Sequence, residues 1–155
     1  KVKDNINLSS SWNKTITIEV PVNEIAGVKL SGSGDISTQT TLKATDFNAA
    51  VSGSGDISLA IEATNLHIQV SGSGDIDLSG SAEDLSVKVS GSGDVNAYGV
   101  VAQDATVAVS GSADVTLTVK GTLNAKVSGS GDIQYKGNPK KVASKVSGSG
   151  DVTGN

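Results

Sequence analysis

The chain has 155 residues, four aromatic side chains (Trp12, Phe47, Tyr98 and Tyr135), no cysteine and a formal net charge of −4. This length suits one domain, residues 1–155, with an interior of Val, Ile, Leu and Ala, and the lack of cysteine excludes disulfides and thiolate chemistry. All its cationic side chains are lysines and they are outnumbered by acidic ones, so nucleic-acid binding is not expected. No apolar run reaches the ~18 to 20 residues of a membrane span, so a membrane-spanning segment is not expected either.

Residues 1–27 precede the repeat that fills the rest of the chain. Ile16, Ile18 and Val20 alternate in the segment TITIEVP, which predicts a strand in the wall of an earlier coil. Trp12 is expected to pack over the open end of the stack, with a ligand-stacking role as the alternative. Because the chain starts at Lys1 without methionine, we expect a mature or trimmed form whose targeting segment has been removed.

One hexapeptide occurs seven times in the remainder of the chain. Successive copies begin 21, 19, 19, 20, 18 and 19 residues apart. Self-similarity at this period is typical of a solenoid, in which each coil packs only on its neighbours. The copies read SGSGDI at Ser31, Ser52, Ser71 and Ser128, SGSGDV at Ser90 and Ser147, and SGSADV at Ser110.

Apolar residues alternate with polar ones on both sides of the hexapeptide. Leu66, Ile68 and Val70 precede the third copy, and Ile76 follows it. This period of two predicts strands with one buried face, because a helix would place apolar residues three and four apart. We therefore predict an all-β fold, a single-stranded right-handed parallel β-helix of about seven to eight coils of ~19 residues. Residues 28–155 would hold the seven hexapeptide coils, and residues 1–27 an N-terminal strand and end-covering segment.

The hexapeptide is interpreted as a bend where two walls of the solenoid converge. Counting by twos from Val51 to Ile57 places both glycines on the inward face and turns the serines and the aspartate outward. Only hydrogen would fit inside such a corner. Ala113 replaces the second glycine in one copy, so this second position should not need a positive φ. The predicted structural glycines of the bend are Gly32, Gly34, Gly53, Gly55, Gly72, Gly74, Gly91, Gly93, Gly111, Gly129, Gly131, Gly148 and Gly150.

All the variation in repeat length falls in the spacers between the strand that follows one hexapeptide and the strand that precedes the next. These spacers contain Gly, Pro and charged residues, as exposed connections do. The predicted solenoid therefore has one constant edge, made of hexapeptides, and one variable edge, made of spacers.

The repeated VSGSGDI preceded by segments such as LSVKV, together with the upstream TITIEVP, resembles the auto-transporter adhesin head domain called the GIN domain. The resemblance covers Ile16 to Val152. It implies a β-helical protein of the bacterial envelope, in a family without an assigned biochemical function. Family members usually carry a further segment, with an earlier hexapeptide-like copy, before the region matching KVKDNINL. We therefore expect this chain to start inside the domain.

The aspartates of the seven copies are predicted to form an outward ladder. At the ~4.8 Å spacing of stacked strands, neighbouring carboxylates repel by roughly 1 kcal/mol per pair in a water-like dielectric. We expect each carboxylate to accept hydrogen bonds from serine hydroxyls or glycine N–H groups of its own bend. The alternative is calcium held by the ladder; no other cofactor is expected. The aspartates are Asp35, Asp56, Asp75, Asp94, Asp114, Asp132 and Asp151.

The sequence holds no evident catalytic grouping, so we expect that the protein is not an enzyme. His67 is the single histidine and the alternation turns it outward, while the serines lack a histidine partner. A polysaccharide-active β-helix enzyme is the alternative. A lysine two residues before the hexapeptide is expected to offset the acidic ladder in four copies, at Lys29, Lys88, Lys126 and Lys145.

The sequence therefore predicts a non-enzymatic module of the cell envelope or surface, adhesin-like or a scaffold. It would bind a protein or glycan ligand through its flat Ser/Asp ladder and its spacers, where Tyr98 and Tyr135 could stack on sugars. We expect export to the periplasm, the outer membrane or the cell surface. The lack of a polar cap after Val152 predicts that more chain or another subunit covers this end, with homo-oligomers as one possibility.

Overall fold

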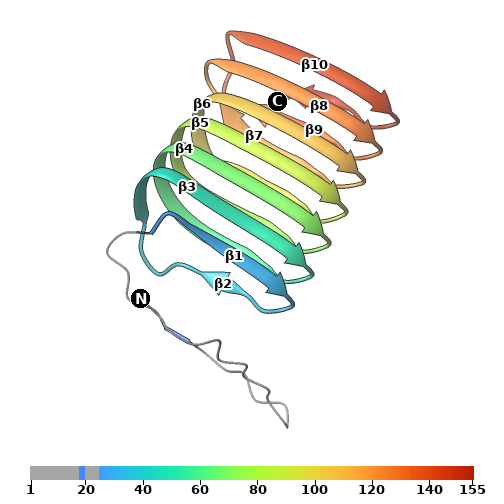
Figure 1. Cartoon of the computed structure of the whole chain (residues 1–155). Coiled ribbons are helices and arrows are strands. Elements are labelled where there is room, and N and C mark those ends of the chain that lie inside the picture. The colour runs from blue at the N-terminus through green and yellow to red at the C-terminus, as the bar shows by residue number, and fades with distance from the viewer. Residues whose placement is uncertain (1–17, 20–24) are drawn as a thin grey trace.

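The structure is a computed structural model that describes residues 18–19 and 25–155. This part of the chain is all β and forms a solenoid of about 7 turns of ~19 residues (Figure 1). The strand pairs are all parallel. The strands are β1 (Gly27–Gly32), β2 (Ile36–Ser37), β3 (Leu42–Gly53), β4 (Ile57–Gly72), β5 (Ile76–Gly91), β6 (Val95–Gly111), β7 (Val115–Val119), β8 (Thr122–Gly129), β9 (Ile133–Lys136), β10 (Lys141–Gly148) and β11 (Val152–Gly154).

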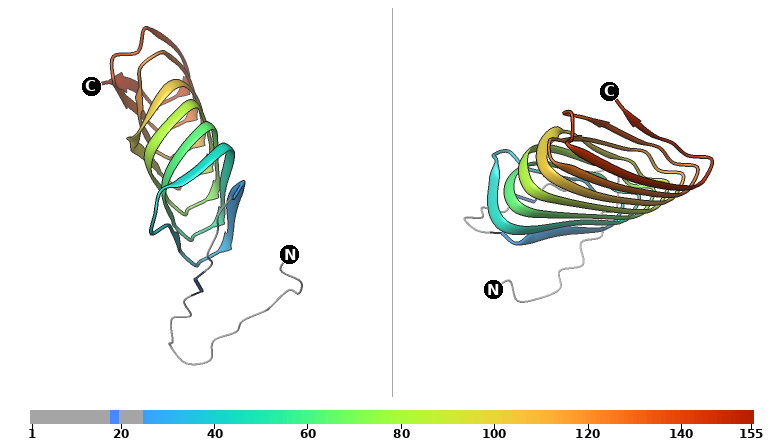
Figure 2. Two further views of the ribbon diagram at one scale, coloured as in Figure 1. Left: turned by 90° about the vertical axis from the view of Figure 1, so that its left-hand side faces the viewer. Right: turned by 90° about the horizontal axis from the view of Figure 1, so that it is seen from above.

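Each coil is flattened into two walls that meet at two edges, as Figure 2 shows from the side and from above. We call the wall whose strands end at a hexapeptide the front wall; it contains β1, β8, β10 and the second halves of β3 to β6. The back wall contains the strands that follow each hexapeptide, among them β2, β7, β9 and β11. The hexapeptides form the turn edge and the spacers form the spacer edge.

The chain winds as a right-handed solenoid, as predicted. In Figure 1 the front-wall strands run from the spacer edge to the turn edge, and the chain returns behind them one coil further along the axis. This is the hand expected of parallel strands joined by crossover connections.

Equivalent residues of successive coils lie in register and form columns along the axis. Val51 pairs with Val70, and Val70 with Val89. Their side chains are buried together between the two walls, at 1%, 1% and 3% exposure. The alternation in the sequence therefore gives the inward columns as predicted, and the core is continuous from Phe47 to Ile133.

The turn edge is held by close contact between the backbones of neighbouring coils. The first glycine of the hexapeptide is half-exposed rather than inward, and it has a positive φ, 129° at Gly72. A Cβ on Gly72 would overlap the carbonyl oxygen of Gly53 in the preceding coil. Glycine was expected here because the interior of the corner would have no room for a side chain. The structure gives a different reason: the backbones of stacked coils approach closely, in a conformation that favours glycine. The second position is buried in every copy except the first, at Gly34, and has no positive φ, in line with Ala113 at that position.

The two ends of the solenoid differ in how much of them the structure describes. The strand expected around Ile16 and Val20, and Trp12 over the open end, lie outside the described residues; Ile18, which is described, is 68% exposed and not in a strand. At the other end β10 pairs with β8 and is exposed along its whole length. Its inward-column residues Val142 and Val146 are 39% and 41% exposed.

We expect Gly72→Val to lower the free energy of unfolding by about 3 kcal/mol or more, because it combines an unfavourable φ with a backbone overlap. Urea denaturation followed by circular dichroism measures this change. Ser73→Ala, at the exposed neighbouring position, is the matched control and should stay within about 0.5 kcal/mol of the original chain. Equal stability of Gly72→Val and the control would contradict the stacked-turn geometry.

Candidate functional site

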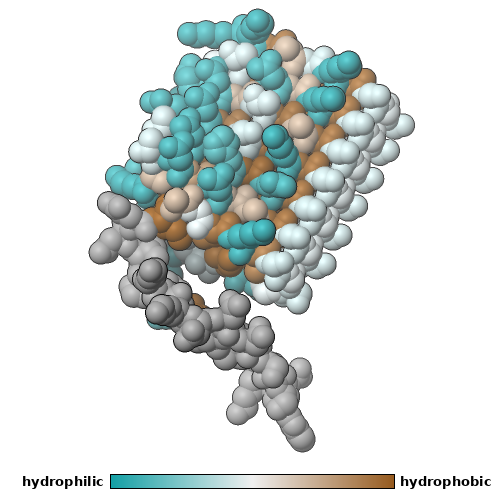
Figure 3. All heavy atoms as spheres, in the orientation of Figure 1, coloured by the Kyte–Doolittle hydropathy of each residue, from teal (hydrophilic) through white to brown (hydrophobic). Residues whose placement is uncertain are grey.

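The outward side chains of the turn edge form a regular surface that we call the ladder face. It consists of two columns of serines and one of aspartates. In Figure 3 it follows the right-hand side of the molecule, where pale rows of residues of intermediate hydropathy run along the solenoid axis. All the serines are exposed: Ser31, Ser33, Ser52, Ser54, Ser71, Ser73, Ser90, Ser92, Ser110, Ser112, Ser128, Ser130, Ser147 and Ser149.

Five of the seven ladder carboxylates, those of Asp56, Asp75, Asp94, Asp114 and Asp132, are bonded along the axis to the next coil. The Asp94 N–H donates to Oδ1 of Asp75 at 2.8 Å, while the Ile76 N–H donates to the carbonyl of Asp94 at 2.9 Å. The same carboxylate bond joins five consecutive pairs of aspartates from Asp56 to Asp151, at 2.8–2.9 Å. The expected partners, hydroxyls and N–H groups of the same bend, are thus not the ones observed. The aspartate carboxylate therefore accepts the hydrogen bond that a backbone carbonyl would accept in a regular parallel sheet.

This bond offsets the repulsion within the aspartate column. Two carboxylates about 4.8 Å apart repel by roughly 1 kcal/mol in a water-like dielectric. A hydrogen bond to a charged group contributes about 1.5–3 kcal/mol, and less where water competes. The aspartates therefore have a structural role that requires no bound cation. Within the described residues no group of three or more His, Cys, Asp or Glu side chains lies close enough together to hold a metal ion, and the calcium alternative stays a prediction.

The other predicted positions lie on the front wall, away from the ladder face. His67 is exposed there, between Asn48 and Ser86 of the neighbouring coils. The four lysines are exposed and share one column, interrupted by uncharged residues such as Ala108. Both serine columns lie between this column and the aspartates, and the described residues show no ion pair between these lysines and the ladder carboxylates.

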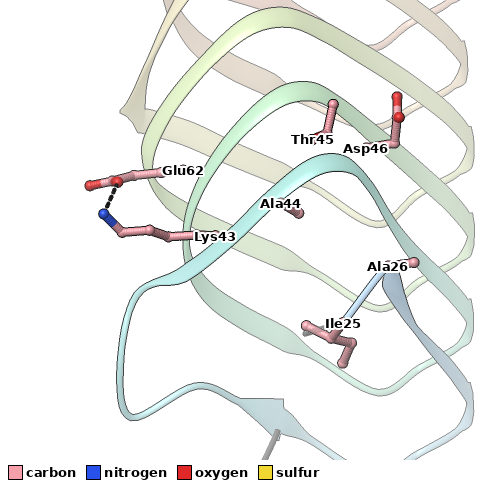
Figure 4. A pocket seen from close by; sticks show the side chains of 7 residues that line it. All are labelled: Ile25, Ala26, Lys43, Ala44, Thr45, Asp46 and Glu62. Carbon is pink, nitrogen blue, oxygen red and sulfur yellow. Dashed lines mark ion pairs between the residues drawn. The ribbon is translucent and has the colours of Figure 1, made fainter. Parts of the chain in front are cut away.

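A hollow of about 800 Å³ opens at the spacer edge near the first coils (Figure 4). Its side chains come from the start of β3, from β4 and from the residues just before β1. Lys43 and Glu62 form an exposed ion pair there, with Nζ 3.1 Å from Oε2, and Asp46 lies further along β3. An exposed ion pair of this kind contributes little to stability, and it forms no nucleophile–base pair.

A second hollow, of about 490 Å³, lies on the back wall between β2 and β6, and we call it the back-wall hollow. Asp77, Asn96 and Tyr98 contribute to its lining. Tyr98 was expected from the sequence as an aromatic near a spacer, whereas Asp77 and Asn96 were not among the predicted positions. Both residues are at outward positions of the alternation and at the same number of residues from the start of their hexapeptide, which places them in one column.

The repeats, the glycine turns and the solenoid agree with one known family. The sequence model described as "Putative auto-transporter adhesin, head GIN domain" matches residues 1–139. The chain belongs to this family. Among the residues that the structure describes, no helix could cross a membrane.

Two solved structures are similar to the chain. A "putative lipid binding protein" from Parabacteroides distasonis is 28% identical, with a TM-score of 0.81 over 83% of this chain and 52% of that one. A "putative adhesin" from Bacteroides fragilis is 26% identical, with a TM-score of 0.78 over 84% of this chain and 61% of that one. This chain therefore spans about half to three-fifths of their lengths. The sequence matches no curated protein.

The axial carboxylate bond can be tested by two substitutions at one position. We expect Asp75→Ala to lower the free energy of unfolding by about 1 kcal/mol, because the Asp94 N–H loses its acceptor. Asp75→Asn should change it much less, because the amide oxygen still accepts and one repulsive charge is removed. Urea denaturation of both variants measures the difference. A stabilising Asp75→Ala would instead mean that repulsion dominates the column.

Proposed function

We propose that this GIN domain is a non-enzymatic, adhesin-like binding module that contacts its ligand through the ladder face and the spacer edge. Membership of the family is consistent with an exported or cell-surface protein that binds ligands at the surface. The observation that carries the proposal is the in-register exposure of the same serines in coil after coil. A flat array of this kind favours contact with an extended surface.

The rigidity of the ladder face supports this use. Its serines stand on turns whose backbone atoms are bonded to both neighbouring coils; Gly53 O, for example, accepts from Ser73 N at 2.9 Å. A ligand that binds there would order few protein side chains, so little conformational entropy opposes the contact. Repetition adds avidity, because once one coil is bound the next is held close to the same ligand surface.

The spacer edge would supply the variable part of the contact. Its coils differ in length and charge, from the Lys43–Glu62 pair near the first coils to Lys136 and Lys140 near the last. Such variation alters which partner is bound without altering the stacked core. A polysaccharide-active enzyme is the competing class, and depolymerisation of soluble polysaccharides by the purified chain would establish it instead.

The adhesion proposal can be tested with beads that carry the purified chain. The triple substitution Ser54→Glu, Ser73→Glu and Ser92→Glu adds three charges and bulk to the ladder face. We expect it to reduce bead retention on immobilised bacterial cell-wall material or mucin at least tenfold. The matched control adds the same charges to exposed front-wall positions, as Asn48→Glu, Thr106→Glu and Asn124→Glu, and should retain binding. Equal retention of the two triple variants would exclude the ladder face as the binding surface.

The calcium alternative has its own test, a thermal melt with and without chelator. A ligand present at 100 times its Kd stabilises the folded state by about 2.7 kcal/mol, which is several degrees of Tm. Since the carboxylates are bonded to the next coil, we expect EDTA to leave the Tm unchanged. A fall in Tm that added calcium reverses, and that Asp75→Asn with Asp94→Asn abolishes, would favour the calcium alternative.

A further inference from the structure

The back-wall hollow crosses four successive coils, from Thr38 to Asn96. At a rise of about 4.8 Å per coil this is roughly 14 Å along the axis. Its volume of about 490 Å³ falls within the range of about 300–1,000 Å³ that is typical of small-molecule sites. It lies on a wall that the ladder-face proposal does not use.

The floor of the hollow is low because three small residues stack in one outward column. Ala60 pairs with Ser79, and Ser79 with Gly99. The register shifts between Asp77 and Ser79, where the neighbouring strand carries one extra residue, Tyr98. Because of this extra residue, glycine occupies the floor position in β6 and the tyrosine is displaced from it.

One rim of the hollow is lined by polar side chains, two of which are hydrogen-bonded to each other. Ser58, Asp77 and Asn96 stack in the column next to the floor, on the side of the turn edge. Asn96 Nδ2 donates to Asp77 Oδ1 at 2.9 Å, and Asn96 Oδ1 accepts from the Thr116 hydroxyl at 3.0 Å. Asp77 still has its second oxygen and Asn96 a second amide hydrogen, so both retain capacity for a ligand.

Tyr98 lines the hollow in its last coil toward the C-terminus, and its side chain extends along the axis. Its hydroxyl lies 3.4 Å from Gln134 Oε1, two coils further along, and Lys136 Nζ is 4.5 Å from the ring centroid. The ring is therefore held along the wall by contacts at its far end and over its face. This leaves an aromatic group fixed beside the rim carboxylate and amide.

We propose that the back-wall hollow binds an uncharged linear oligosaccharide. Hydroxyls, a carboxylate and an amide converge on it beside an aromatic ring, and these groups match the donors and acceptors of sugar hydroxyls. The lining includes Asp77 and no cation; Lys136 lies outside it, over the Tyr98 ring, and the aspartates of the ladder face lie two residues away, as Asp75 does from Asp77. An anionic polysaccharide would be repelled.

A peptide fits this hollow less well than a sugar chain. Peptides are usually held by unpaired backbone groups at a sheet edge or by apolar pockets. Here β4, β5 and β6 under the hollow are paired on both sides, while β2 pairs with β4 only, and the lining residues Leu59 and Leu78 are buried, at 2% and 5% exposure. The rim instead offers one polar group per coil, about every 4.8 Å. An extended glycan advances by nearly the same distance per sugar, so consecutive sugars meet equivalent positions.

Isothermal titration calorimetry of the full chain with defined hexasaccharides tests the proposal. The probes are cellohexaose, chitohexaose, mannohexaose and xylohexaose, with hexagalacturonic acid as the anionic probe. We expect at least one neutral probe to bind and hexagalacturonic acid not to bind. Ser79→Gln, which fills the floor from an exposed position, should weaken binding at least tenfold. Thr106→Gln, a matched substitution on the front wall, should leave it unchanged.

The proposal is wrong if no neutral hexasaccharide binds, if only the anionic probe binds, or if Ser79→Gln and Thr106→Gln bind alike. Circular dichroism melts of both variants verify that folding is retained. The ladder-face triple glutamate variant should bind the hexasaccharide as the original chain does. Failure of the glycan titration would leave the adhesion measurement unaffected, because the two experiments change different surfaces.

Discussion

Successive coils approach each other at the turn edge with backbone against backbone and no side chain between them. Gly53 O accepts two hydrogen bonds from the next coil, from Ser73 N at 2.9 Å and Gly74 N at 3.1 Å, and a Cβ on Gly72 would occupy the same space as that oxygen. The turn therefore fixes the axial spacing and register of every coil at one point. A slip of one residue would turn each inward column outward, so the buried core and the outward columns both depend on this contact.

The stacked turn also explains why so many identical copies are needed. One coil alone exposes the edges of both its strands and buries few of its aliphatic side chains, so it cannot offset the entropy of ordering its chain. Stacking buries Val51 against Val70 and Val70 against Val89, and it provides the acceptors for turn N–H groups and the partners for the aspartates. Where stacking ends, at β10, the inward-column valines are exposed by about two-fifths, at 39% and 41%. Stability in this fold is therefore a property of neighbouring coils.

Much of this arrangement could be predicted from the sequence because its signals are local and repeated. The repeat period predicted the coils, the alternation of apolar and polar residues predicted the inward columns, and Ala113 indicated which glycine position tolerates a side chain. Contacts between coils along the axis could not be predicted from the sequence. Asp75 accepts a hydrogen bond from Asp94, and the sequence pattern does not encode the relative orientation of two residues that lie 19 apart. The back-wall hollow was missed for a similar reason. It arises from one extra residue at Tyr98, whose effect on the floor appears only once β5 and β6 are paired.

The two surfaces differ in how freely their chemistry can vary. At the turn edge, the backbones of neighbouring coils lie close together, the first glycine has a positive φ, and the aspartate is hydrogen-bonded to the next coil. These constraints leave room for small side chains at the remaining positions, so each coil presents nearly the same groups. On the back wall the outward column next to the turn edge carries no such requirement, and successive coils hold Ser58, Asp77, Asn96, Thr116 and Gln134. A uniform ladder suits repeated contact with an extended surface, whereas a column of different side chains can distinguish one ligand from another. The back wall is therefore better suited than the turn edge to select one particular ligand.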